Sequence, residues 1–307
     1  MDLLLLLMVV IWGANYSVAK RAFEEIPAPA FNGLRVAIAS LVFLTLIGVA
    51  RRRGRQSTGL SRVFYTPHPP TARDRWNLLW VGIVGHFLYQ WTFISGLART
   101  SPSNGALIIG ATPVVVAMLS STLKIERVTR VHWIGALVSV VGLYFVVRSG
   151  SQIQGATLQG DLLILFAAAC WAIYTVGSGQ LMARHSPLYV TGMTMAIGGL
   201  PYAALMLPDV LKVDWTQVSA WAIVAVVASS LLALCLSYLI WYAAVQRIGS
   251  ARTSMYSNLV PIAAIAVAAV WLREPLPSIK LVGAALVVTG VFLTRLGRPA
   301  TAVPIEE

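Results

Sequence analysis

Charged residues are scarce in this chain, and their scarcity decides its class. Only 11% of the 307 residues are Asp, Glu, Lys or Arg, 58% are hydrophobic, and the mean hydropathy is +0.77. A soluble domain carries about 25% charged residues. Apolar runs of about 18 or more residues with few charges are typical of membrane-spanning helices. Such runs fill most of the chain, so the composition excludes a soluble protein and predicts an integral membrane protein.

Acidic residues are missing from the interior of these apolar runs. All eleven Asp and Glu residues fall at the ends of the runs or in the links between them. Proton relays in membrane proteins usually place an Asp, Glu or His within a span, and only His86 is so placed. No span carries an Arg or Lys pair that would suit a phosphate, and Arg35, alone inside a span, is expected to snorkel outward. The sequence therefore favours transport that does not depend on protons.

Cysteine is also nearly absent, since the chain holds only Cys170 and Cys235. Both lie inside apolar runs without a Cys/His cluster, so we expect buried thiols and neither a disulfide nor a metal site. The H-E-x-x-H motif is absent, and no Ser–His–acid set is available at depth for an intramembrane enzyme. The sequence predicts no enzyme, no metal and no cofactor.

The positive charges lie almost entirely in the links between apolar runs. Lys and Arg number 23 against 11 Asp and Glu, but this distribution is typical of a membrane protein with many spans and not of a nucleic-acid-binding face. The runs far exceed the about 10 residues of a barrel strand, so the spans should be helices. We expect ten spans: 3–20, 29–50, 76–98, 102–123, 131–148, 161–183, 187–208, 217–245, 251–272 and 277–296. The first run has no cleavage signature and is expected to be retained.

The orientation follows from the basic residues. With the N-terminus in the cytoplasm, the inside links hold 15 Lys and Arg residues and the outside links hold 7. The positive-inside rule then predicts that both termini are cytoplasmic, as is the Arg-rich loop 51–75. Lys20 and Arg21 oppose this locally, and the count over the whole chain outweighs them.

The chain repeats itself. A shift of 148 residues aligns Arg99 with Arg247, Pro113 with Pro261, Glu126 with Glu274, Gly135 with Gly283 and Gly142 with Gly290. A shift of 159 residues aligns Asp2 with Asp161 and Trp12 with Trp171. We expect two domains, residues 1–149 with the extra loop 51–75, and residues 150–307 with a short tail. Because each holds five spans, the second enters the membrane from the opposite side. This predicts an all-α membrane protein of two inverted five-helix repeats, which in transporters alternately expose a site at mid-membrane.

Two prolines mark possible hinges. Pro113 and Pro261 are expected near the middle of the fourth and ninth spans, where a proline cannot donate to the carbonyl four residues back. Gly105 and Gly110 add flexibility to the fourth span. A kink that only improves packing is the alternative interpretation.

Polar and aromatic side chains gather on single helix faces at mid-span. The spacing i, i+3, i+4 puts Trp12, Asn15 and Tyr16 on one face. The residues expected to line a central cavity are Trp12, Asn15, Tyr16, His86, Tyr89, Gln90, Trp171, Tyr174, Ser237, Tyr238, Trp241, Tyr256 and Asn258. Interfacial aromatic belts and polar contacts between helices are the alternatives. An uncharged aromatic cavity suits neutral molecules with apolar parts, and zwitterions.

Several of these motifs resemble a known family. The run Trp12-Gly13-Ala14-Asn15, the paired proline segments at 110–114 and 258–262, and the paired Glu and Gly positions are similar to the EamA type of the drug/metabolite transporter superfamily. Within it the chain looks most like bacterial YddG-type exporters. The resemblance implies a ten-helix inverted-repeat fold, an inner-membrane location and export of aromatic and other neutral amino acids. The first half departs from the second in having Gly110 where Asn258 stands.

We therefore expect an exporter that moves amino acids and related small metabolites outward by alternating access, as a facilitator. The alternative is export of drugs or other amphipathic metabolites by proton antiport through the same fold. The expected partners are a small-molecule substrate and the lipid bilayer, with no nucleic acid. The sequence leaves the oligomeric state open.

Overall fold

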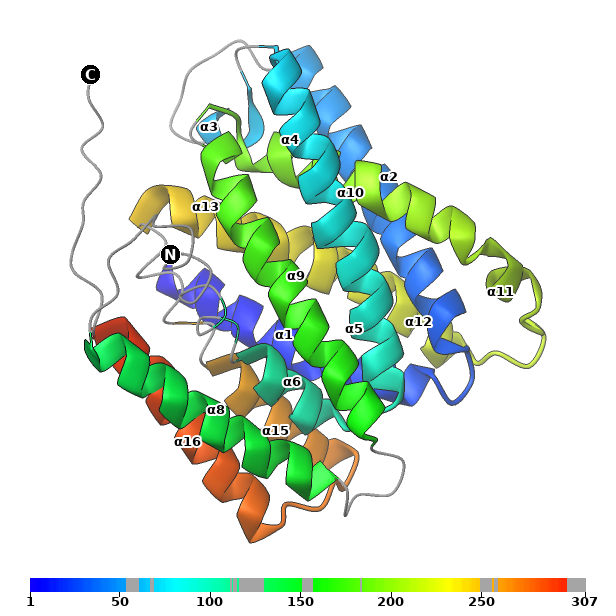
Figure 1. Cartoon of the computed structure of the whole chain (residues 1–307). Coiled ribbons are helices and arrows are strands. Elements are labelled where there is room, and N and C mark those ends of the chain that lie inside the picture. The colour runs from blue at the N-terminus through cyan, green and yellow to red at the C-terminus, as the bar shows by residue number, and fades with distance from the viewer. Residues whose placement is uncertain are drawn as a thin grey trace.

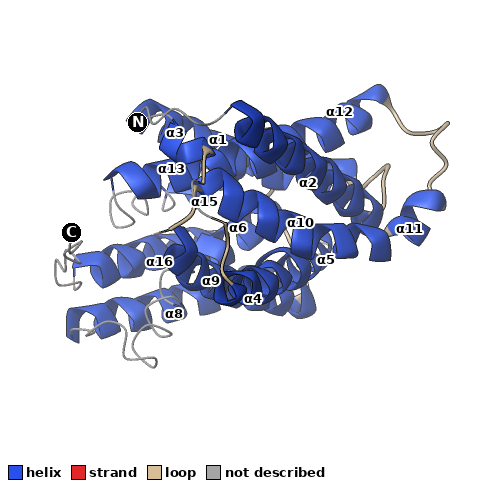
Figure 2. Cartoon of the chain, turned by 90° about the horizontal axis from the view of Figure 1, so that it is seen from above, coloured by secondary structure: helices blue, strands red, loops and turns tan. Residues whose placement is uncertain are grey.

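Every regular element that the structure describes is a helix, which confirms the predicted all-α class (Figure 2). The computed structural model describes residues 1–53, 61–66, 69–110, 112, 115, 130–150, 157–182, 184–248, 256 and 259–296. Within these residues, six helices are long and apolar enough to cross a membrane. Shorter apolar helices over Leu259–Trp271 and Ser278–Gly290 accompany them.

The α-helices follow one another along the chain as labelled in Figure 1. They are α1 (Asp2–Ala22), α2 (Ala28–Arg53), α3 (Ser61–Phe64), α4 (Ala72–Gly82), α5 (Tyr89–Ala98), α6 (Pro102–Gly110), α8 (Arg130–Gly150), α9 (Leu158–Met182), α10 (Pro187–Leu205), α11 (Leu207–Leu211), α12 (Ala220–Ala228), α13 (Ser237–Ile248), α15 (Leu259–Trp271) and α16 (Ser278–Leu296). Two π-helical segments, η1 (Ile83–Leu88) and η2 (Ser229–Leu236), join α4 to α5 and α12 to α13.

Three helices depart from the predicted spans, and capping groups explain two of these departures. The third span begins at Ala72 and not at 76, because Thr71 and Asp74 form a capping box around the first turn. The eighth begins at Ala220 and not at 217, because the Ser219 hydroxyl accepts the Ala222 N–H. The seventh ends at Leu205, before the separate short helix α11.

Of the two prolines predicted to act as hinges, Pro261 lies within the described residues. Pro261 is the third residue of α15 as described, Leu259–Trp271. Pro113 and Asn258 lie outside the described residues, so the hinge stays a prediction. A Cβ on Gly110 would lie 2.6 Å from the Pro261 ring, so the two proline-bearing segments are in close contact.

The repeated glycines bring α8 and α16 side by side (Figure 1). A Cβ on Gly142 would lie 2.8 Å from the Gly283 carbonyl oxygen, and one on Gly290 would lie 2.5 Å from that of Gly135. In the repeat, Gly135 corresponds to Gly283 and Gly142 to Gly290. The contact between Gly142 and Gly283 therefore has its counterpart in the contact between Gly290 and Gly135, as expected for two segments related by a twofold axis.

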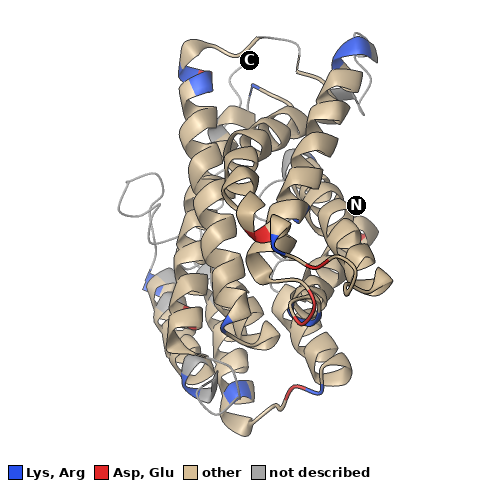
Figure 3. Ribbon diagram, turned by 90° about the vertical axis from the view of Figure 1, so that its right-hand side faces the viewer, with Lys and Arg blue, Asp and Glu red and all other residues tan. Residues whose placement is uncertain are grey.

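Two sets of polar contacts mark the two ends of the helix bundle. At one end of the bundle, Lys20 in the last turn of α1 donates to the Thr100 carbonyl, and the Thr100 hydroxyl donates to Asp161 in the first turn of α9. We call this the Lys20 end. At the other, the Asp74 end, Asp74 in the first turn of α4 pairs with Arg184, which follows α9. Helices α1 and α9 therefore run in opposite directions, and Figure 3 shows long helical stretches between the ends without charged residues.

Candidate functional site

Aromatic side chains from both halves of the chain meet within the bundle. Neighbouring ring centroids lie 4.9–6.4 Å apart. The members of this aromatic cluster are Trp12 on α1, His86 on η1, Tyr89 on α5, Trp171 and Tyr174 on α9, and Tyr238, Trp241 and Tyr242 on α13. The first three come from the first repeat and the rest from the second, so the cluster joins the two halves.

Trp171 lies at the centre of the aromatic cluster. Its ring centroid is 5.3 Å from that of Tyr89, 5.4 Å from that of Tyr238 and 6.4 Å from that of Trp12. The Trp12 and Tyr238 rings meet it edge to face, at 90° and 81°. Aromatic pairs favour such edge-to-face packing because the ring face is electron-rich and the edge is electron-poor.

The π-helical segments help to build the cluster. η1 and η2 occupy equivalent positions in the two repeats, since a shift of 148 places Ile83 on Leu231 and Leu88 on Leu236. A π-helical turn leaves backbone groups outside the regular ladder and is common at functional sites. The Trp12 indole N–H donates to the Ala233 carbonyl of η2 at 2.9 Å. Trp12 therefore offers a ligand its ring faces and not its donor.

A glycine lets the second repeat approach η1. A Cβ on Gly85 would lie 2.2 Å from the Tyr174 ring, so this ring can pack there only against glycine. Within the cluster, Tyr174 and Tyr238 are buried, whereas Trp12, Tyr89 and Trp171 are only partly buried. These three rings form the accessible part of the cluster.

The expectation that the Arg35 side chain would snorkel outward is wrong. The side chain is 2% exposed and turns inward from α2, with its guanidinium 6.0 Å from the Phe31 ring centroid. Nη1 donates to the Ser229 hydroxyl at 3.0 Å, and Nη2 donates to the Gln90 side-chain oxygen at 3.2 Å. Ser229 in turn donates to Asn15. Arg35 thus ties α2 to α5 and η2 at the edge of the aromatic cluster.

The structure brings most of the predicted site residues to this region. Gln90 accepts a hydrogen bond from Arg35, and Asn15 accepts one from Ser229, which Arg35 also contacts. Tyr16 packs edge-on against Phe93, and Phe93 stacks on Tyr89. Several buried polar atoms here have no hydrogen-bond partner among the described residues: Ser237 Oγ, Gln90 Nε2, Arg35 Nε and both His86 ring nitrogens. Tyr256 does not join them, since it lies beside Asp2 at the start of α1.

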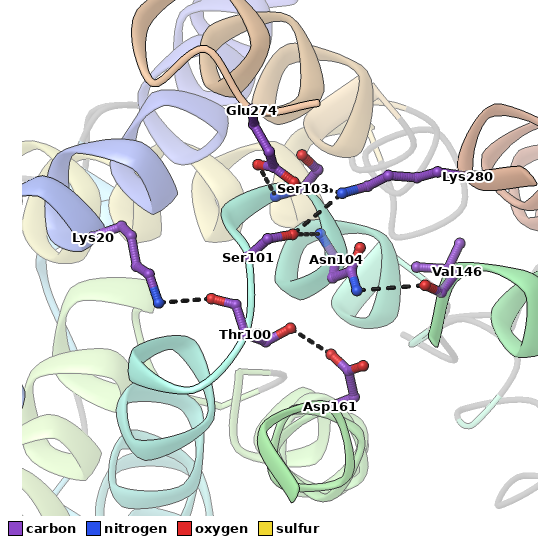
Figure 4. A network of polar contacts seen from close by, with 9 residues as sticks. All are labelled: Lys20, Thr100, Ser101, Ser103, Asn104, Val146, Asp161, Glu274 and Lys280. Carbon is purple, nitrogen blue, oxygen red and sulfur yellow. Dashed lines mark hydrogen bonds and ion pairs between the residues drawn. The ribbon is translucent and has the colours of Figure 1, made fainter. Parts of the chain in front are cut away.

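A second polar network lies at the Lys20 end of the bundle (Figure 4). Lys20 Nζ donates to the carbonyls of Leu97, Ala98 and Thr100 at 2.8–3.1 Å, which satisfies carbonyl groups left free at the end of α5. Thr100 donates to Asp161 of the second repeat. The α5–α6 link is therefore held by α1 on one side and by α9 on the other.

The α15–α16 link reaches the same segment with a buried ion pair. Lys280, fully buried, pairs with Glu274 and donates to the Ser101 hydroxyl at 3.2 Å (Figure 4). The Ser103 N–H donates to Glu274 at 3.4 Å. Burial acts to raise the pKa of Glu274, but the Lys280 charge and the hydrogen bonds from Lys280, Ser101 and Ser103 together hold that pKa below its ordinary value of 4.5. The ion pair belongs to the second repeat, and its hydrogen bonds to Ser101 and Ser103 join it to the first.

Comparison with known proteins identifies the family. The EamA-like transporter family matches residues 1–148 and 158–296. The uncharacterized transporter YyaM of Bacillus subtilis is 31% identical over 217 residues, which cover 69% of this chain and 70% of that protein. The probable terminal-alkyne amino-acid exporter of Streptantibioticus cattleyicolor is 28% identical, with 94% and 91% covered.

Two further matches cover almost the whole chain. The probable amino-acid metabolite efflux pump of Salmonella typhimurium is 26% identical, with 96% of this chain and 94% of that protein covered. A solved structure superposes with a TM-score of 0.64 at 22% identity, with 98% of each chain covered, and so shares the fold. With two copies of the family pattern spanning its length, the chain belongs to the EamA-like transporter family and is a multi-pass membrane transporter, not an enzyme.

Proposed function

We propose that this transporter exports aromatic and other neutral amino acids, with related small metabolites, across the bacterial inner membrane. The aromatic cluster carries this proposal, because half-buried ring faces bind apolar and aromatic side chains. Neutral polar groups lie at its edge, and no described carboxylate bonds to a cluster residue. The names of the Streptantibioticus and Salmonella relatives, which mention amino acids, support the same substrate class.

The export would proceed by alternating access between two inverted repeats, residues 1–149 and 150–307. The opposite directions of α1 and α9, and the paired glycines of α8 and α16, support this arrangement. With both termini cytoplasmic, the Lys20 end faces outward, and its network holds that side closed. Opening would break these bonds while the segments around Pro113 and Pro261, with Gly105 and Gly110, act as hinges.

The second candidate is export of drugs or other amphipathic metabolites by proton antiport. The same ring faces would accept such molecules, and a buried His86 beside Tyr174, 4.9 Å between ring centroids, favours this candidate as the group that would carry the proton. The two candidates differ in substrate and in energy source.

Counterflow in proteoliposomes separates the candidates. Purified protein would be reconstituted with unlabelled L-phenylalanine, L-leucine or the cationic dye ethidium inside, and labelled L-phenylalanine outside. We expect transient accumulation of label with either amino acid inside and none with ethidium, relative to protein-free liposomes. Protein-dependent ethidium transport, with no amino-acid counterflow, would favour the drug exporter.

A further inference from the structure

The charge of Arg35 has no counter-ion within the described chain. The described ion pairs involve Arg21, Arg184, His185 and Lys280, and none involves Arg35. Its two hydrogen-bonded neighbours, Ser229 and Gln90, are neutral. A buried charge without a partner of opposite sign is strongly unfavourable. This site is therefore suited to an anion supplied from outside the chain.

Unused donors lie in the same place. Arg35 Nε and Gln90 Nε2 are buried and have no acceptor among the described residues. Both nitrogens are hydrogen-bond donors only, so a ligand that satisfied them would need an acceptor with at least two lone pairs. A carboxylate has two such oxygens, and guanidinium matches its planar geometry better than ammonium does.

The Arg35 group adjoins the accessible rings. Gln90 follows Tyr89 in the chain, and Asn15 lies one turn from Trp12 on the same face of α1. A ligand with an aromatic part against Trp171 could therefore extend an acidic group toward Arg35.

We propose that Arg35 and Gln90 form a carboxylate-binding subsite at the edge of the aromatic cluster, which selects substrates with an acid group. This inference rests on the proposed function, since it names the group by which an amino acid would be recognised. It also makes a distinct claim: amines and amides with the same side chain should be poor ligands. A purely structural Arg35, which only cross-links α2, α5 and η2, would show no such selectivity.

The unmodified protein tests this selectivity without any substitution. Thermal unfolding of the purified transporter would be followed with phenylacetate, phenylacetamide and acetate. We expect phenylacetate to stabilise at concentrations about ten- to a hundred-fold lower than phenylacetamide, because a hydrogen-bonded charge pair is lost with the amide. Acetate should be weaker than phenylacetate, since it lacks the ring. Equal stabilisation by phenylacetate and phenylacetamide, or by neither, would overturn the subsite.

Two substitutions test whether the preference for phenylacetate over phenylacetamide depends on Arg35 and Gln90. Arg35→Gln should remove the preference for phenylacetate over phenylacetamide while the weak response to phenylacetamide changes less than about threefold. Gln90→Glu places a carboxylate beside Arg35 and should have the same effect with the guanidinium retained. Arg75→Gln, at an exposed position of α4, is the matched control and should keep the preference. A preference that survives in both Arg35→Gln and Gln90→Glu would contradict the proposal.

The same ligands and variants, together with the counterflow measurement, distinguish this inference from the proposed function. If phenylacetate binds through Arg35 but no amino acid shows counterflow, the acid subsite stands and amino-acid export falls. If amino acids exchange and Arg35→Gln slows L-phenylalanine and L-phenylalaninamide equally, export stands and the subsite falls.

Discussion

Trp12 and Trp171 pack against each other and against Tyr238, and each keeps part of its surface accessible. We expect Trp171→Ala to lower the initial rate of amino-acid counterflow at least about fivefold, because each lost aromatic contact is worth about 0.5–1.5 kcal/mol. Trp12→Ala should lower it similarly and also reduce thermal stability, since the indole bond to the Ala233 carbonyl is lost. Rates would be normalised to the folded protein recovered by size-exclusion chromatography.

Trp76→Ala is the control for these substitutions. Trp76 is 66% exposed on α4 and lies outside the aromatic cluster, so its loss should change the rate less than about twofold. Trp171→Phe should retain most of the activity, since it keeps an aromatic face. Normal counterflow by both alanine variants would remove the cluster from the transport path.

The residues of this site differed in how well the sequence could predict them. Trp12 and Trp171 align in the repeat and stand among polar residues at helical spacing, and these are local signals. Arg35 has no local signal, because a lone Arg in an apolar run looks like one that reaches the interface. Its partners Gln90 and Ser229 lie 55 and 194 residues away in the chain, so only the fold reveals them.

At the scale of helices, the Glu274–Lys280 pair fastens the α15–α16 link to the α5–α6 link. Glu274→Gln alone should lower the free energy of unfolding by about 3–5 kcal/mol, because it leaves Lys280 buried without a counter-ion. Glu274→Gln combined with Lys280→Met should recover most of this loss. Glu24→Gln, which breaks the exposed pair with Arg21, is the control and should cost less than about 1 kcal/mol. Thermal unfolding in detergent measures all four proteins.

The same pair predicts a dependence on pH. The pKa of Glu274 is lower in the folded protein than its ordinary value of 4.5, so its stabilisation is fully present above that value and is lost as pH falls through the folded pKa. Between neutral pH and pH 3, the unmodified protein should lose more stability than the double variant. Equal losses would mean that Glu274 carries no buried charge.

Some helix ends carried a signal in the sequence that the predicted spans missed, whereas the π-helical interiors carried none. Thr71 followed by Asp74 is a recognisable capping signal, and it places the start of the third span at Ala72. The predicted span began instead at Trp76, the first residue of the apolar run. The π-helical segments had no signal, because η2 is an ordinary apolar run in sequence. They matter to the site nevertheless, since η2 presents the carbonyl that anchors Trp12.

At the scale of the whole molecule, the repeat in the sequence predicted two similar halves, and the family pattern matches residues 1–148 and 158–296. The inverted arrangement of five spans per half stays a prediction. The orientation in the membrane is a separate question, since it depends on loop charges and not on packing. We expect a cysteine introduced by Arg75→Cys, at the Asp74 end, to react with a membrane-impermeant maleimide only from the cytoplasmic side. Gln217→Cys, in the exposed link before α12, should react only from outside. The native Cys170 and Cys235 are buried and should give little background. The reverse labelling pattern would invert the topology.

Energy coupling is also a property of the whole cycle, and we expect this transporter to work as a facilitator. His86 is fully buried, both its ring nitrogens lack a hydrogen-bond partner among the described residues, and no described carboxylate bonds to it. A proton taken up there would bury a positive charge, and none of the described ion pairs gives His86 an acidic group to pass it on.

Proteoliposomes with an inward-directed proton gradient and equal L-phenylalanine on both sides should therefore accumulate nothing beyond protein-free controls. Counterflow driven by the amino-acid gradient should proceed at similar rates between about pH 6 and pH 8, since a neutral imidazole has no charge to lose as the pH rises. His86→Gln keeps a polar side chain of similar size, so it should change this rate less than about threefold and leave its pH profile flat. Concentrative movement of L-phenylalanine under the proton gradient, abolished by His86→Gln, would instead establish antiport through His86.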